Sequence, residues 1–303
     1  MSTILQKVVT PQASAAYLTS GWDRVAGFLV QAADVAFAST PAQLFEIHAL
    51  GYPGSPFSVA DPFVDVLRFP SYPTLQLVNA IGGVDQATRA LTGGPFVDRA
   101  PFTGTGFATA EGRIVPVWWL THTRLAPDSV LVRIFADGSS EELARYPDVG
   151  QGWVVDGVAV GRRSPLSRFV GTLASFNGAY YVADVLEGGS RVALAMDAQP
   201  ADSLFMQTAP GAWRREIARE EAQQILELNV EANWNGLELR IVDEWTDEAG
   251  VEQSRGSYVG HNADLAEGLR LVKLEAGVYE VTVPKGALEA VKTSQLAPAS
   301  WAS

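Results

Sequence analysis

The pattern FNGAYYVAD at residues 176–184 and the pattern WNGLELRIVD at residues 234–243 decide how the second half of this chain folds. Each begins with an aromatic residue followed by Asn-Gly and continues as a β-rich run that reaches an aspartate. Asn-Gly between two such runs is a strong hairpin signal, because a type I′ turn needs positive φ at both central residues. The two patterns therefore predict two similar hairpins.

The segments that contain these hairpins also end alike. Gly211-Ala212-Trp213 and Gly277-Val278-Tyr279 each open a closing strand, and short helical stretches are expected at residues 219–226 and 285–291. A unit of about 60 residues with this order of elements is typical of a small SH3-like barrel. We expect two tandem SH3-like repeats, at residues 168–226 and 227–295, with chance similarity as the alternative.

The first half of the chain is expected to form one α+β domain at residues 20–160. Helices are predicted from Thr40, an N-cap followed by Pro41, and at residues 84–91. Pro116 should interrupt its strand. Residues 161–167 are expected to link the two halves, and the fold class is α+β and mainly β. Apolar patterning predicts strands at residues 24–30, 64–69, 74–80, 114–120, 130–135 and 141–146.

The composition excludes several classes of function. The 303 residues include no cysteine and three histidines, which excludes disulfides and thiolate metal sites and nearly excludes a histidine-based zinc site. Asp and Glu number 34 against 22 Lys and Arg, a net charge of −12, which disfavours a nucleic-acid or anionic-membrane partner. No cofactor or metal is expected. Without an apolar run of signal-peptide or membrane-span length, we expect a soluble, cytoplasmic protein.

A polar, glycine-spaced loop at residues 98–107 is the first candidate binding site. Arg99 could hold an anion, and the hydroxyl of Thr103 lies close in sequence to Gly104 and Gly106, where a backbone can approach a ligand. The loop lacks the lysine of a P-loop, so a bulged hairpin is the alternative.

Arg68, Thr105 and Glu142 are candidate catalytic residues in an alternative interpretation. Their order resembles that of ADP-ribosyltransferase-type folds, which use an arginine on a first strand, a Ser/Thr-rich second strand and a later glutamate. No Glu-X-Glu pair or tyrosine-flanked glutamate follows. The other interpretation of Arg68 is a strand residue paired with a carboxylate such as Asp65 or Asp98.

Trp119 is a candidate anchor for a partner. It alternates with Trp118, so at most one of the two lies in the core of a one-sided sheet and the other is free to contact a partner. The three histidines, at positions 48, 122 and 261, are isolated in the sequence and are interpreted as structural.

The most unusual local composition is a run of carboxylates in the second predicted repeat. Only Arg240 opposes the run. It is either a solvated hairpin or an acidic surface that docks into a basic cleft. The six residues lie within fifteen positions and are Glu238, Asp243, Glu244, Asp247, Glu248 and Glu252.

The chain also resembles a group of actinobacterial proteins. The resemblance rests on LGYPGSPF at 50–57, VLRFP at 66–70, GTGF at 104–107, GHNA at 260–263 and AGVY at 276–279. Those proteins are similar to immunity-type partners from loci of secreted polymorphic toxins. The resemblance implies a cytoplasmic binding protein that neutralises a toxin, with NAD-attacking toxins as one class, and it implies no catalytic residue.

Three functional hypotheses follow. The first is a non-enzymatic immunity factor that binds a protein partner, such as a basic toxin domain. The second is an enzyme in residues 20–160 that processes NAD or another nucleotide. The third is a structural or phage-associated protein whose repeats mediate assembly. The oligomeric state stays open.

Overall fold

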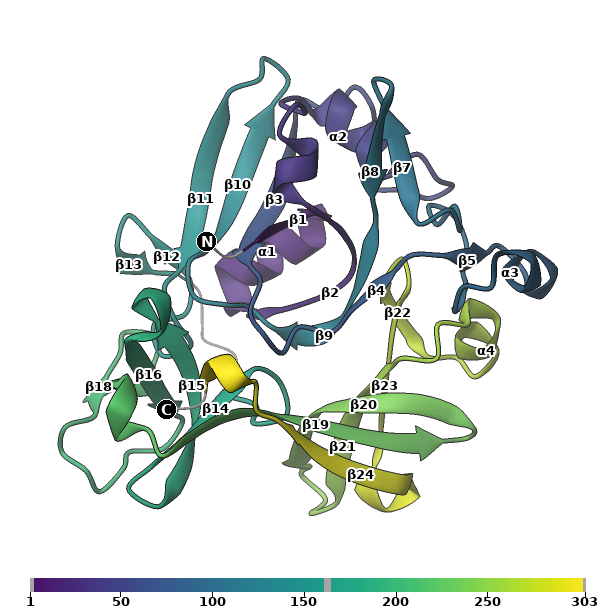
Figure 1. The fold of residues 1–303 in the computed structure, drawn as a ribbon. Helices are drawn as coiled ribbons and strands as arrows, with labels where there is room; N and C mark the ends of the chain where they lie inside the picture. Colours follow the sequence, from purple (N-terminus) through teal and green to yellow (C-terminus); the bar gives the residue numbers. More distant parts are fainter. Residues whose placement is uncertain (1–2, 161–164, 302–303) are drawn as a thin grey trace.

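The chain is mainly β, with 47% of its residues in strands and 16% in helices, which confirms the predicted mainly-β α+β class. The computed structural model describes residues 3–160 and 165–301. Most strands belong to two antiparallel sheets, one in the upper part and one in the lower part of Figure 1.

The first sheet comes entirely from the N-terminal half and holds nine strands. The strand β1 (Ile4–Val9) lies near the centre of this sheet and pairs with β2 (Arg24–Gln31) and β3 (Phe63–Pro70). The sequence predicts no strand before residue 24, so β1 and the helix after it are elements that the proposed start at residue 20 leaves out. In spatial order the strands are β13 (Val158–Ala159), β12 (Val154–Val155), β11 (Ser140–Tyr146), β10 (Ser129–Phe135), β3 (Phe63–Pro70), β1 (Ile4–Val9), β2 (Arg24–Gln31), β9 (Trp118–Arg124) and β4 (Leu77–Asn79).

Helices cover both faces of this sheet. Tyr17 of α1 (Pro11–Ser20) packs with Leu5 and Val9, whereas Leu44 of α2 (Pro41–Ile47) packs with Val8 on the other face. Side chains alternate across a strand, so each central strand supplies apolar groups to two cores. The predicted helix start is confirmed, because Thr40 caps α2 and its hydroxyl accepts a hydrogen bond from the Gln43 amide.

Two short ribbons extend from the first sheet. The helix expected at residues 84–91 is confirmed as α3 (Gln86–Thr92). The strand expected at residues 114–120 is split after Pro116. The elements here are η1 (Ala32–Val35), β5 (Gly82–Gly83), α3 (Gln86–Thr92), β6 (Phe96–Val97), β7 (Phe107–Ala110) and β8 (Arg113–Pro116). β5 pairs with β6, and β7 with β8.

The second sheet holds eleven strands from the C-terminal half. Both Asn-Gly pairs form the expected hairpin turns, with φ of 50° and 77° at Asn177-Gly178 and 48° and 77° at Asn235-Gly236. In spatial order the path is β17 (Met206–Gln207), β18 (Trp213–Ala218), β16 (Arg191–Met196), β15 (Ala179–Leu186), β14 (Thr172–Phe176), β19 (Gln224–Trp234), β20 (Leu237–Thr246), β21 (Glu252–Tyr258), β23 (Val278–Pro284) and β22 (Val272–Glu275), with β24 (Glu289–Leu296) beside β19.

The same order of strand pairing occurs twice in this sheet. A hairpin is followed by a third strand, a short strand, a closing strand, a 3₁₀ turn and a last strand that pairs with the first. However, two SH3-like barrels are not confirmed, because among the described residues neither set closes and β19 serves both. Its length of 11 residues carries it across the proposed boundary at 226–227.

The helical stretches expected at 219–226 and 285–291 are much shorter than predicted. Each is one 3₁₀ turn, η3 (Arg219–Glu221) and η4 (Lys285–Ala287), and the chain then extends into β19 and β24. The remaining elements are η2 (Glu187–Gly189), α4 (Ala263–Gly268) and η5 (Ala299–Trp301). Of the predicted linker, residues 161–164 lie outside the described residues.

Ion pairs join the two sheets, and most of the cations come from the N-terminal half. Arg124 of β9 is buried and donates hydrogen bonds to the carbonyls of three C-terminal residues and to the carboxylate of Asp184. Partners on several sides satisfy a charge that would otherwise be costly to bury. Among the described residues, an N-terminal cation also meets a C-terminal carboxylate in Lys7–Glu275, Arg24–Asp243, Arg99–Asp264 and Arg99–Glu267.

The Arg124→Met variant tests this junction. It leaves the buried Asp184 carboxylate without its cation, so the free energy of unfolding should fall by about 3–5 kcal/mol in urea denaturation. Arg145→Met is the matched control, because Arg145 pairs with Glu142 on the exposed surface of β11, where a pair contributes about 0–1 kcal/mol. Equal losses in the two variants would contradict the role given to Arg124.

Candidate functional sites

The predicted anion-binding loop at residues 98–107 is used to hold the chain together. Arg99 lies within 2.8 Å of Asp264 and of Glu267, both on α4, so its charge is already matched by two carboxylates. At Gly104, a Cβ atom would lie 2.5 Å from the carbonyl oxygen of Gly82. The close approach that this glycine permits is therefore to the protein's own backbone.

The three residues of the catalytic alternative lie on separate elements, and each has its own partner. Arg68 donates a hydrogen bond to Gln6 (2.9 Å) instead of pairing with Asp65, which binds Arg133. Thr105 contacts Thr103 (2.9 Å) just beyond β4, whereas Glu142 lies on β11 with five strands of the sheet between. The structure keeps the elements that carry these residues apart.

Trp119 is a core residue and cannot serve as a surface anchor. Its exposed fraction is 0%, and its indole N–H donates to the carbonyl of Gly277 (3.1 Å). Its ring contacts Phe96 and His261. Trp118 is partly buried and packs against the core that contains Leu5 and Leu120. The two tryptophans therefore alternate across β9 as expected, but neither is a free surface anchor.

The acidic run does not form one uniform patch. Asp243 pairs with Arg24 (3.2 Å) and Glu244 with Lys285 (2.7 Å), and Asp247 accepts backbone hydrogen bonds within the β20–β21 turn. Arg240, which was expected to oppose the run, instead pairs with buried Glu227. The exposed members are Glu238 near the start of β20 and Glu248 and Glu252 near its far end.

Exposed apolar side chains recur on α4 and β22, which follow each other in the chain. We define the α4–β22 surface as Leu265, Leu269, Val272 and Leu274, which are 51%, 39%, 62% and 49% exposed. α3 lies beside it, because β6 next to α3 bridges to the N-cap of α4 (Figure 1). The leucine on α3, Leu91, is 87% exposed. Clustered exposed apolar side chains typically mark a site of protein contact.

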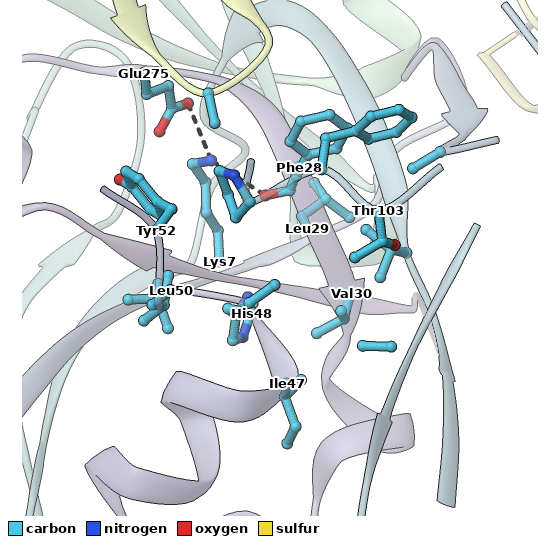
Figure 2. A pocket seen from close by; sticks show the side chains of 18 of the residues that line it. Lys7, Phe28, Leu29, Val30, Ile47, His48, Leu50, Tyr52, Thr103 and Glu275 are labelled. Carbon is cyan, nitrogen blue, oxygen red and sulfur yellow. Dashed lines mark hydrogen bonds and ion pairs between the residues drawn. The ribbon is translucent and has the colours of Figure 1, made fainter. Parts of the chain in front are cut away.

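A cavity of about 100 Å³ lies between the first sheet and the turn that joins β22 to β23. Its walls are mostly apolar, and Thr103 and Phe107 on one side are exposed, so the cavity reaches solvent there. Figure 2 shows side chains from β1, β2 and α2 directed toward it. The apolar walls include Phe28, Leu29, Val30, Ile47, Leu50 and Val117.

The polar end of the cavity is built from Lys7, His48 and Glu275. Lys7 is buried, and its Nζ lies 3.0 Å from a Glu275 carboxylate oxygen and donates to the Phe28 carbonyl (3.1 Å). Within the residues that the structure describes, the buried Nε2 atom of His48 has no hydrogen-bond partner. Burial, with the charge of Lys7 nearby, lowers the pKa of the His48 imidazole to about 3, so the ring is neutral at pH 7.

The sequence offers only a partial signal for this cavity. His48 follows a capped helix and lies beside the LGYPGSPF motif, and Thr103 belongs to the glycine-spaced loop. Lys7 and Glu275 are far apart in the chain, and no pattern links them. Only the packing of the β22–β23 turn on β2 brings them together.

Among the described residues, no group of three or more His, Asp or Glu side chains is arranged to hold a metal ion. Within the same residues, no helix combines the length and apolar character needed to cross a membrane.

Comparisons with known proteins give no relative for this chain. No protein-family model matches it, and neither a curated protein nor a solved structure is significantly similar. The function must therefore be argued from the sites themselves.

The pKa of His48 gives a testable pH dependence. The unfolded imidazole takes up a proton near pH 6.5, but the folded one does so only near pH 3. The free energy of unfolding therefore decreases as the pH falls below 6.5, because the unfolded chain binds a proton that the folded chain does not bind. Between pH 7 and pH 5, the native chain should lose roughly 1–2 kcal/mol more of its unfolding free energy than His48→Leu. Urea unfolding at both pH values measures this, and equal losses would show that His48 charges in the folded state.

Proposed function

We propose that this chain is a non-enzymatic binding protein whose partner is another protein. The observation that carries the proposal is the α4–β22 surface, where four large apolar side chains are exposed within ten residues. Exposed leucines of this density lose contact with water when a partner covers them, which favours association. Arg99 fixes α4 through two carboxylates, so the surface is presented on a positioned element.

Charge supports a basic partner. The chain carries a net charge of −12, and Glu248 and Glu252 stay exposed at the far end of the β20–β21 hairpin. Carboxylates of this kind speed the approach of a positively charged protein more than they tighten the final complex.

The resemblance to immunity-type proteins supplies the class of partner. We infer a toxin domain with a basic surface, neutralised by binding in the cytoplasm. The twofold recurrence of strand pairing, each time with a 3₁₀ turn before the last strand, supports two degenerate SH3-like repeats that share β19. Small β modules of that type present loops and edges on which a partner can dock.

The first test uses the product of the neighbouring gene as the candidate partner. Leu265→Asp with Leu269→Asp should weaken its capture at least about tenfold, because two charges would be buried in an apolar contact. Both side chains are exposed, so the variant should keep its thermal stability.

The matched control for this test is Leu204→Asp, at a leucine in the loop between β16 and β17 that is 64% exposed and lies outside the α4–β22 surface. Equal weakening by the control would contradict the assignment of the surface. A chain that captures no neighbouring product and protects no cell would contradict the immunity-type function, and self-assembly in light scattering would favour the assembly hypothesis.

The second test concerns the exposed carboxylates. Glu248→Lys with Glu252→Lys should slow association with the same partner by about tenfold at low salt and leave the dissociation rate nearly unchanged. Glu220→Lys is the control, because it also replaces an exposed glutamate by a lysine, but beside β18. Surface plasmon resonance at two salt concentrations measures both rates, and an association rate without salt dependence would argue against electrostatic docking.

A further inference from the structure

We propose that the cavity between β1, β2 and the β22–β23 turn binds a small carboxylic acid whose apolar part is about the size of an isobutyl or phenyl group. The residues that line this cavity include none of the four that define the α4–β22 surface, and the proposal does not depend on the protein partner.

The size and lining of the cavity set the apolar part of the ligand. Its volume is about 100 Å³, and the aromatic and aliphatic walls include Phe28, Ile47 and Val117. An apolar cavity of about 150 Å³ holds one benzene molecule in a well-studied protein, so this smaller space suits a branched aliphatic group, or one ring that extends into the opening beside Thr103 and Phe107. It is too small for a dinucleotide, since pockets for larger ligands occupy roughly 300–1,000 Å³.

The polar end sets the carboxylate. Lys7 carries three N–H donors, of which the contacts to the Phe28 carbonyl and Glu275 occupy two. His48 presents a buried Nε2 with no partner in the described part of the chain, on a neutral ring that can donate one hydrogen bond. The Lys7 ammonium can bind a carboxylate, because charge-assisted hydrogen bonds are the stronger kind, and the His48 imidazole lines the same cavity.

Glu275 occupies the place of the ligand's carboxylate. It is the last residue of β22, and its side chain is 25% exposed, so it can turn toward solvent when another carboxylate binds Lys7. The contact depends on Gly27 of β2, where a Cβ atom would lie 2.7 Å from a Glu275 oxygen and 3.3 Å from Lys7 Nζ. The backbone is therefore shaped to admit a carboxylate at this point.

The experiment measures binding of benzoate and of its neutral analogue benzamide to the full chain by isothermal titration calorimetry. Benzoate should bind in the millimolar range and benzamide at least about tenfold more weakly, because only the anion engages Lys7. 3-Methylbutanoate and N-acetyl-L-leucine separate the two sources of the same chemistry. Tighter binding of the first identifies a free acid, and tighter binding of the second identifies a peptide carboxyl terminus.

Two variants act in opposite directions. Glu275→Gln removes the internal competitor for Lys7, so it should tighten benzoate binding by about tenfold, whereas a purely structural role of Glu275 would give no gain. Ala108→Leu fills the cavity from β7 without changing any charge and should abolish binding. Glu220→Gln, an exposed change in η3, is the control and should leave the affinity unchanged.

Equal affinity for benzoate and benzamide would overturn the role of Lys7. Weaker benzoate binding in Glu275→Gln, or unchanged binding in Ala108→Leu, would overturn the site. Absence of binding to the native chain would also overturn it, and none of these outcomes bears on capture of the protein partner.

Discussion

Buried ion pairs between the two sheets are the interaction on which the rest of this structure depends. Arg124 reaches from β9 into the second sheet and hydrogen-bonds three carbonyls and Asp184. A lone guanidinium in this position would be strongly unfavourable, and its multiple partners make one relative position of the sheets much better than others. The halves are thereby fixed by specific charges as well as by apolar packing.

Both candidate sites lie along this junction. The cavity is bounded by the end of β22, where Glu275 pairs with Lys7, and α4 is held by Arg99 through Asp264 and Glu267. A ligand that displaces Glu275 would act on one of the contacts between the sheets. The position of α4, which presents the apolar leucines, depends on another ion pair between an N-terminal cation, Arg99, and C-terminal carboxylates.

The local sequence predicted individual elements well and their assembly poorly. Thr40-Pro41 and the two Asn-Gly pairs specify a helix start and two turns through backbone dihedral preferences, which act within a few residues. β1 was missed because a central strand is recognised by its neighbours on both sides, and these lie more than 20 residues away. Arg99, Trp119 and the acidic run were correctly seen as unusual, but their partners lie in distant segments.

The sequence by itself determined the mainly-β class, the hairpin turns, the acidic charge and the exclusion of cysteine chemistry, because composition and short-range torsional preferences are properties of adjacent residues. Tertiary structure alone decided that Lys7 and His48 face one cavity, that Glu275 closes it and that Trp119 is buried. It also separated Arg68 from Thr105 and Glu142. Burial, charge pairing and cavity shape depend on which distant segments pack together, and no local pattern encodes that pairing.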